Sequence, residues 1–176
     1  MDDAILLDEV RTILSTTPGR WKSLAFSLSA DLLTRKPLEG DWAALECLHH
    51  LIDTERWVFP TRIRALLAGQ DFAAFNPNAQ GPRTTSHTPM QLAAEFARRR
   101  LKSLRMLEQI TPAEFSRTAR HPSLGQVTLR EMLHTWAAHD LMHTVQAERA
   151  LMQPFIAGCG PWHVYFTDHI AKAKEQ

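Results

Sequence analysis

The sequence is poor in the features that mark several common classes of protein. It has only two cysteines in 176 residues, too few for a disulfide framework, which indicates a reduced, cytoplasmic setting. The formal net charge is +1, so no overall field favours nucleic acid or an anionic membrane. Its apolar runs are short and interrupted by charge, which excludes a membrane span. The first residues, MDDAILLDEV, are acidic where a signal peptide would be basic. We therefore expect a cytoplasmic protein.

Several motifs that carry known chemistry are also missing. The sequence contains no Gly-rich phosphate loop and no zinc-finger set of cysteines. Cys47 and Cys159 lack an activating neighbour, so we expect both thiols to be buried and inert. In and just after ARRRLK, the cations Arg98, Lys102 and Arg105 share one helical face. This stripe could contact nucleic acid, but a solvated face or a subunit contact fits the near-neutral charge better.

Apolar periodicity predicts helices almost throughout and no convincing strand. The first helical segment covers about 2–33, with a break expected near TTPGRW, where Pro18 and Gly19 interrupt the pattern. A second helix is predicted over about 42–67, with Asp41 as its N-cap and Gly69 as its stop. Residues 69–87, rich in Gly, Pro, Asn and Thr, are predicted to form an irregular loop that covers part of a cleft.

The second half of the chain continues this helical pattern. Thr88 and Pro89 open a third helix that extends to about residue 110. A connector follows, and a capping box of Thr128 and Glu131 then starts a fourth helix that extends to about residue 152. A short last helix is expected after GCGPW. The length suits one domain, so residues 1–176 are predicted to form a single all-α bundle.

Histidine is the unusual component of the composition, with nine residues. His139 and His143 are four residues apart on the fourth predicted helix, about 40° around its axis and about 6 Å along it. They can therefore bind one metal ion together, although histidines packed in a core would share this spacing. His134 lies about 140° round the helix from His139 and should point elsewhere.

The second predicted helix offers a third ligand. It contains ALECLHHLIDTERW, in which His49 lies at the edge of the apolar face and His50 lies further round. Periodicity alone slightly favours His49 as the inward residue, and an exposed pair of histidines beside acids is the alternative. Glu46 and Asp53 flank His50 by about one turn, where a carboxylate could hold a ligating imidazole.

The arrangement of these motifs resembles the DinB-like family, which includes YfiT-like metal-dependent proteins. The resemblance rests on a Trp soon after the first linker, on His-Leu-x-Asp-x-Glu in the second helix and on His-Asp-x-x-His in the fourth. It covers about residues 14–146. It implies an up-down-down-up four-helix bundle, often a homodimer, with a divalent metal on His50, His139 and His143. Where the helical wheel and the family motif disagree about His49 and His50, the motif favours His50.

Three histidine ligands leave at least one coordination position open, as in catalytic metal sites. Zn or Ni is the expected ion, with Fe or Mn next. The resemblance implies a metal-dependent enzyme acting on a small molecule, either a transferase that uses a low-molecular-weight thiol or a hydrolase. The alternative is a non-catalytic stress-related or ligand-binding bundle. Asp140 points about 100° away from His139 and is expected either to support the site or to pair with an arginine. Trp57 and His49 are the candidates for lining the cavity.

Overall fold

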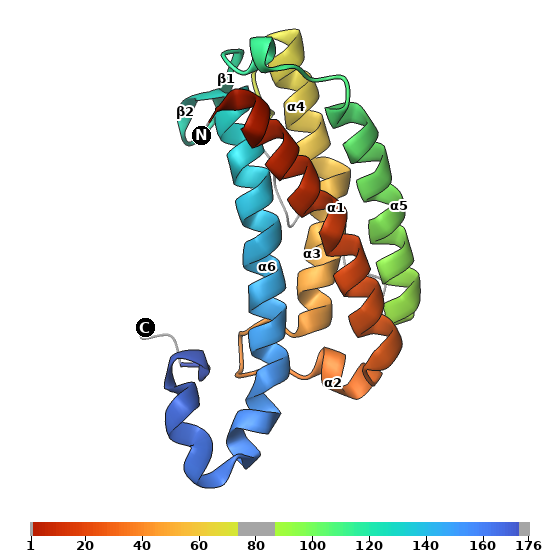
Figure 1. Cartoon of the computed structure of the whole chain (residues 1–176), viewed down its shortest axis with the longest axis vertical. Helices are drawn as coiled ribbons and strands as arrows, with labels where there is room; N and C mark the ends of the chain where they lie inside the picture. Colours follow the sequence, from red (N-terminus) through yellow and green to blue (C-terminus); the bar gives the residue numbers. More distant parts are fainter. Residues whose placement is uncertain (1, 74–86, 173–176) are drawn as a thin grey trace.

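Four helical rods lie side by side and form an all-α bundle (Figure 1). The computed structural model describes residues 2–73 and 87–172. The rods are α1 (Asp3–Ser27), the consecutive helices α3 (Ala44–Trp57) and α4 (Phe59–Ala68), α5 (Pro89–Leu107) and α6 (Leu129–Gly158). α1 and α6 run in one direction and the other two rods in the opposite one, so the predicted up-down-down-up order is confirmed (Figure 1). The short elements are α2 (Ala30–Thr34), η2 (Pro112–Glu114) and the 3-10 helix η3 (Gly160–His169), which is the predicted last helix.

The predicted helix starts at Thr88 and Thr128 and the predicted stop at Gly69 are confirmed, whereas α6 extends through Pro154 to Gly158, beyond its predicted end near residue 152. Thr128 caps α6, and its backbone N–H donates to Glu131 Oε2 at 2.7 Å, as a capping box requires. Gly69 ends α4 in the left-handed conformation, with φ of 65°. The predicted N-cap at Asp41 is wrong, because α3 begins two residues later. There Ala43 occupies the N-cap position, and its N–H donates to Glu46 Oε2 at 2.8 Å.

The predicted break near TTPGRW is wrong, since α1 continues through Pro18. A proline inside a helix has no N–H to donate to the carbonyl four residues earlier, which here belongs to Leu14. That carbonyl oxygen accepts a hydrogen bond from Nη1 of Arg100 at 2.8 Å instead. The side chain of a neighbouring helix thus replaces the missing bond, and α1 stays whole.

The second predicted helix is in fact two helices that meet at Val58. This residue has φ of −110° and ψ of −80°, and α4 starts directly after it with Pro60 in its first turn. A proline is tolerated in the first turn of a helix, but it has no N–H to donate to the carbonyl four residues earlier, and its ring clashes with that carbonyl. Here that carbonyl belongs to Arg56 of α3. Pro60 therefore divides the rod, whereas Pro18 does not divide α1.

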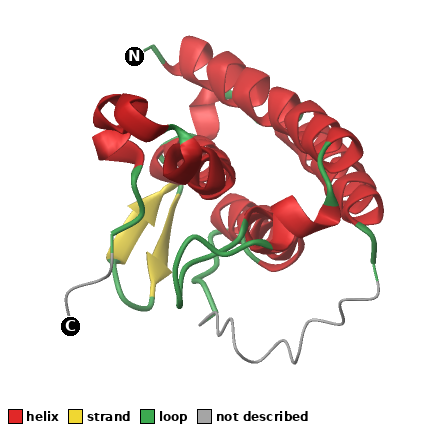
Figure 2. Cartoon of the chain, turned by 90° about the horizontal axis from the view of Figure 1, so that it is seen from below, coloured by secondary structure: helices red, strands yellow, loops and turns green. Residues whose placement is uncertain are grey.

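The prediction that the chain has no strand is also wrong. Strands β1 (Thr118–His121) and β2 (Gly125–Thr128) pair antiparallel in the connector before α6 (Figure 2). Each strand has four residues, too short for a clear alternating pattern in the sequence. Ala119 is buried, and Phe72 donates its N–H to the carbonyl of Arg120 at 3.0 Å. The hairpin is thereby attached to the end of α4.

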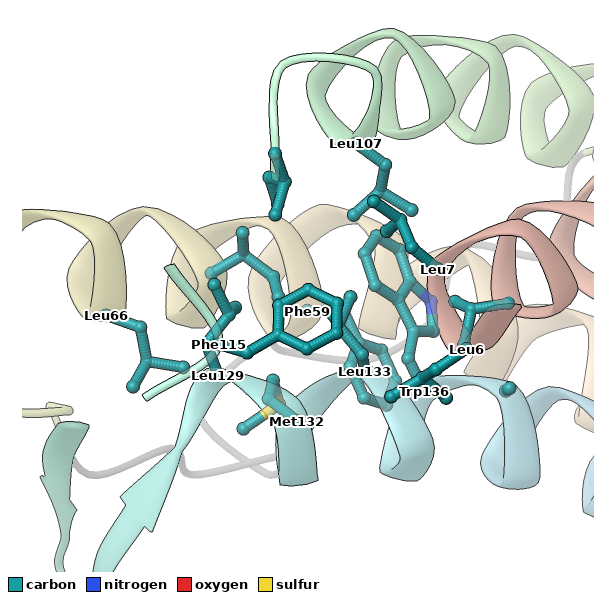
Figure 3. Packing of buried hydrophobic residues seen from close by; sticks show 14 of the residues in the cluster. Leu6, Leu7, Phe59, Leu66, Leu107, Phe115, Leu129, Met132, Leu133 and Trp136 are labelled. Atoms are coloured by element: carbon teal, nitrogen blue, oxygen red, sulfur yellow. The ribbon is translucent and has the colours of Figure 1, made fainter. Parts of the chain in front are cut away.

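The bundle core divides into two clusters of buried side chains. One gathers around Trp136 and Phe59, whose rings stack with centroids 5.1 Å apart (Figure 3). The other gathers around Trp21, Leu48 and Phe96. In residues 2–73 and 87–172 we find no helix with the length and hydrophobicity of a membrane span.

The two cysteines differ in exposure, which corrects the expectation that both are buried. Cys47 is fully buried, and burial, together with the charge of Glu46, raises the pKa of its thiol to about 12. Cys159 is only half-buried. We expect the native protein to react with one equivalent of a disulfide reagent at pH 8 and with two after unfolding. Cys159→Ser should leave no reactive thiol in the native protein, and reaction of that variant at the native rate would contradict the burial of Cys47.

Candidate metal centre

Three histidines from two helices converge on one point between α3 and α6. His50 comes from α3, and His139 and His143 come from α6. The ring nitrogens that they offer lie within 4.8 Å of one another. The Nε2 atoms of His50 and His139 are 3.1 Å apart. The structure therefore brings together the three residues that the family motif indicated, and it selects His50 over His49.

The spacing of these nitrogens suits a metal ion. Two imidazole nitrogens that bind one zinc ion at about 2.0–2.1 Å are about 2.9 Å apart at a right angle and about 3.3 Å apart at a tetrahedral angle. The 3.1 Å between the two Nε2 atoms falls in this range. In a metal-free protein the same contact requires a proton on one of the two nitrogens. The donor set, made only of imidazoles, suits Zn, Ni, Cu or Fe.

Aromatic rings enclose the three histidines. Trp42, just before α3, stacks on His143 with centroids 5.6 Å apart and an interplanar angle of 17°. Its ring also lies 5.0 Å from that of His50. Phe59 meets His139 edge-on at 5.1 Å. Trp57 lies elsewhere: it is 45% exposed, and the guanidinium of Arg56 packs against its ring. Trp42 and Phe59, rather than the predicted Trp57, are thus the aromatic residues that pack against the three histidines.

Burial keeps the two imidazoles of α6 neutral. Burial, together with the neighbouring His143, His50 and Arg100, lowers the pKa of His139 to about 3. Burial also lowers the pKa of His143. A neutral imidazole has a lone pair to give to a metal ion, whereas a protonated one has none. Both histidines of α6 are therefore ready to act as ligands at neutral pH.

The comparisons place this site in a known family. The model of the DinB superfamily matches residues 13–147, which include all three histidines. The chain belongs to the DinB superfamily. The resemblance seen in the sequence motifs is thereby confirmed. Comparison with curated proteins finds no match.

Two solved structures from Bacillus subtilis share the fold. YfiT, described as a probable metal-dependent hydrolase with an unusual four-helix bundle topology, matches with a TM-score of 0.73 and 18% identity, over 85% of this chain and 87% of YfiT. The DinB-like protein YjoA matches with a TM-score of 0.57 and 19% identity, over 84% of this chain and 92% of YjoA. At these identities the likeness concerns the fold.

Gln146 supports the site in this DinB-superfamily chain, and the sequence motifs did not reveal it. Its Oε1 lies 2.8 Å from Nδ1 of His143. An amide oxygen only accepts hydrogen bonds, so Nδ1 of His143 must carry the proton and Nε2 keeps its lone pair. Gln146 therefore selects the tautomer that binds metal through Nε2. Its position three residues after His143, on the same side of the helix, is the signal that could have identified it.

We expect Gln146→Leu to lower the affinity for Zn²⁺ by about 10–100-fold, because His143 loses the acceptor that fixes its ring. Gln146→Glu, which keeps an acceptor at the same place, should retain the affinity. Both can be measured by competition with a chromophoric chelator. Equal affinities for the leucine variant and the wild type would show that Gln146 does not orient the ligand.

The carboxylates that the sequence placed near the histidines have different surroundings. Glu46 accepts from the N–H of Ala43, and its second oxygen lies 3.3 Å from Nζ of Lys36, so it serves the start of α3. Asp53 is half-buried on α3. Asp140 is 1% exposed and pairs with Arg100, which is the arginine pairing that the sequence allowed.

Arg100 is the centre of a buried polar cluster that sequence reasoning missed. The cluster consists of Arg100, Glu55, Asp140, Ser103 and Trp136. Burial by itself lowers the pKa of Arg100, but its hydrogen bonds and charge pairing with Asp140 and Glu55 raise it above the ordinary value. The guanidinium is therefore charged. A signal was present, since Arg100 lies four residues after Phe96 and seven before Leu107, on the buried face of α5.

Proposed function

We propose that this chain is a metal-dependent enzyme that binds one divalent ion through His50, His139 and His143, and that hydrolysis of a small molecule is its reaction. The observation that carries the proposal is the convergence of three imidazoles from two helices, with ring nitrogens within 4.8 Å of one another. Three protein ligands leave a coordination position for a reactant, whereas a structural zinc site is closed by four. The description of YfiT as a probable metal-dependent hydrolase supports hydrolysis.

A divalent ion at this place would supply Lewis acidity, which lowers the pKa of a bound water or thiol and polarises a carbonyl. The chain's own residues prepare the site for it. Gln146 holds His143 in the required tautomer. Trp42 and Phe59 pack against the imidazole rings, and His143 is only 5% exposed. Electrostatic interactions are stronger in such partly desolvated surroundings.

A cavity of about 730 Å³ is the proposed place for the substrate, although none of the three histidines lines it directly. Trp42 and Gln146, which both contact His143, belong to its wall. Leu141, Met142 and Val145 add an apolar surface from α6. The volume suits a small organic molecule with an apolar body.

The C-terminal segment forms the opposite wall of this cavity. Gln153 Nε2 donates to the carbonyl of His169 at 2.9 Å, and the N–H of Ala171 donates to Gln153 Oε1 at 2.9 Å. Arg149 also donates to the carbonyl of Asp168. Arg149 and Lys172 line this side and could contact a polar end of the substrate. The predicted loop over the cleft falls mainly on residues 74–86, which lie outside the described residues.

Thiol transfer is the second proposed function, since a divalent ion would also bind and ionise a thiol. The chain supplies no such thiol at the cavity, since Cys47 is fully buried in the core and Cys159 is not among the residues that line the cavity. The thiol would therefore be a low-molecular-weight cosubstrate in the cavity. A requirement for an added thiol therefore distinguishes thiol transfer from hydrolysis in an experiment.

The test uses full-length protein purified without a histidine tag. Its metal content should approach one equivalent, and the Zn²⁺ or Ni²⁺ form should convert a panel of small esters, amides and electrophiles. Activity should disappear with a chelator and return with the ion. Turnover without added thiol supports hydrolysis, and turnover only with a small thiol supports transfer. Bound metal with no turnover across the panel would favour a non-catalytic binding protein. Val145→Arg, at an exposed position of the wall, should raise KM without loss of metal.

A further inference from the structure

We infer that Arg100 is a positioning residue that holds the two ligand-bearing helices in register at the metal centre. This inference rests on the metal binding proposed above. Arg100 belongs to α5, which provides none of the three histidines. It is 1% exposed, and its guanidinium lies between α3 and α6.

Arg100 contacts both of the helices that carry the proposed ligands. Arg100 Nε donates to Glu55 Oε1 of α3 at 2.8 Å. Nη1 and Nη2 donate to the two carboxylate oxygens of Asp140 of α6, at 2.9 and 2.7 Å. Asp140 directly follows the ligand His139, and Glu55 follows the ligand His50 by five residues, about 7.5 Å along the helix. One rigid group therefore connects short segments next to both ligands.

Further hydrogen bonds fix the carboxylate of Glu55 and the guanidinium of Arg100. Ser103 donates to Glu55 Oε2 at 2.6 Å, and the indole N–H of Trp136 donates to Glu55 Oε1 at 3.1 Å. Arg100 also donates to the Leu14 carbonyl in α1. The guanidinium is thus bonded to each of the other three rods of the bundle, and none of its bonds reaches solvent-exposed groups.

Directed hydrogen bonds add a constraint on geometry that apolar packing alone does not. A buried ion cluster often gives no more stability than apolar residues of equal volume, so stability alone does not require this one. Apolar cores tolerate small rearrangements and lose rigidity before they lose the fold. A metal site, however, needs its ligands held within about 0.5 Å. A bidentate pair of Arg100 and Asp140 supplies this directional constraint.

The experiment compares Arg100→Lys with the wild type. Lysine keeps the positive charge but lacks the planar fork that bonds two oxygens of one carboxylate. We expect the Zn²⁺ affinity, measured by chelator competition, to fall at least about tenfold, as for loss of other groups that orient ligands. The visible absorption bands of the Co²⁺-loaded variant should shift or broaden, because the ligand geometry is less uniform.

Leu66→Ala is the matched control for a loss of stability alone. Leu66 is fully buried in α4, and Figure 3 shows it far from Trp136 in the same cluster. Its truncation leaves a cavity that destabilises the fold but should leave the affinity and the Co²⁺ spectrum unchanged. Wild-type values for both readouts in Arg100→Lys would overturn the inference. Should that variant fail to fold, Glu55→Gln provides the same comparison with the same two readouts. Absence of Zn²⁺ and Co²⁺ binding by the wild type would instead refute the proposed function.

Discussion

His139→Ala is expected to reduce the affinity for Zn²⁺ by more than about 100-fold, while the bundle remains folded. Loss of a group that only orients a ligand costs about 10–100-fold in affinity, and loss of the ligand itself should exceed that range. The substitution removes the nitrogen that lies 3.1 Å from Nε2 of His50, so only two of the three proposed ligands remain. Isothermal titration or chelator competition measures the change. The metal-dependent activity should be lost with it.

The same helix offers a matched control for this prediction. His134 lies five residues earlier on α6 and is exposed, so His134→Ala removes an imidazole without touching the cluster. We expect this variant to bind Zn²⁺ as the wild type does. A binding site formed by surface histidines would give the opposite order, with His134→Ala as the weaker binder. Unchanged affinity in His139→Ala would show that the ion binds elsewhere.

Arg100→Met is expected to lower the free energy of unfolding by about 3–5 kcal/mol. Methionine occupies part of the volume but donates no hydrogen bond. Glu55 and Asp140, 4% and 1% exposed, would then lose their cationic partner in a buried environment. The Leu14 carbonyl would lose its donor as well. Urea denaturation with an unchanged slope would measure the loss directly.

Arg98→Met is the control, two residues away on the same helix. The side chain of Arg98 is 55% exposed and pairs with Glu95 on the surface. Such exposed pairs contribute about 0–1 kcal/mol, so this variant should unfold close to the wild-type midpoint. Similar losses for both variants would mean that the buried cluster has no special role in stability.

The fold was largely predictable because helical periodicity is a local property of the sequence. The errors came where a distant residue decides the local structure. Pro18 and Pro60 look alike in the sequence, yet α1 continues through Pro18, where Arg100 bonds the freed carbonyl, whereas Pro60 separates α3 from α4. Four-residue strands are too short to show a reliable alternating pattern, and the β-hairpin was missed for that reason.

The candidate site was predictable to the extent that its residues follow a motif. The spacing of His139 and His143 indicated a shared face, and the family motif selected His50 where helix periodicity slightly favoured its neighbour. Trp42 and Gln146 were missed because their roles depend on contacts with His143. The Arg100 cluster was missed because it joins residues that are 40 to 81 positions apart in the chain.

The proline in α1 has a consequence for how the protein acquires its structure. In an isolated segment corresponding to α1, the carbonyl of Leu14 would have to bond to water, whereas in the folded chain the guanidinium of Arg100 in α5 donates to it. The first helix is therefore completed only when the third rod docks against it. Isolated helices are marginal even without such a defect. Assembly of this bundle should accordingly be concerted, with helix formation and docking as one cooperative event.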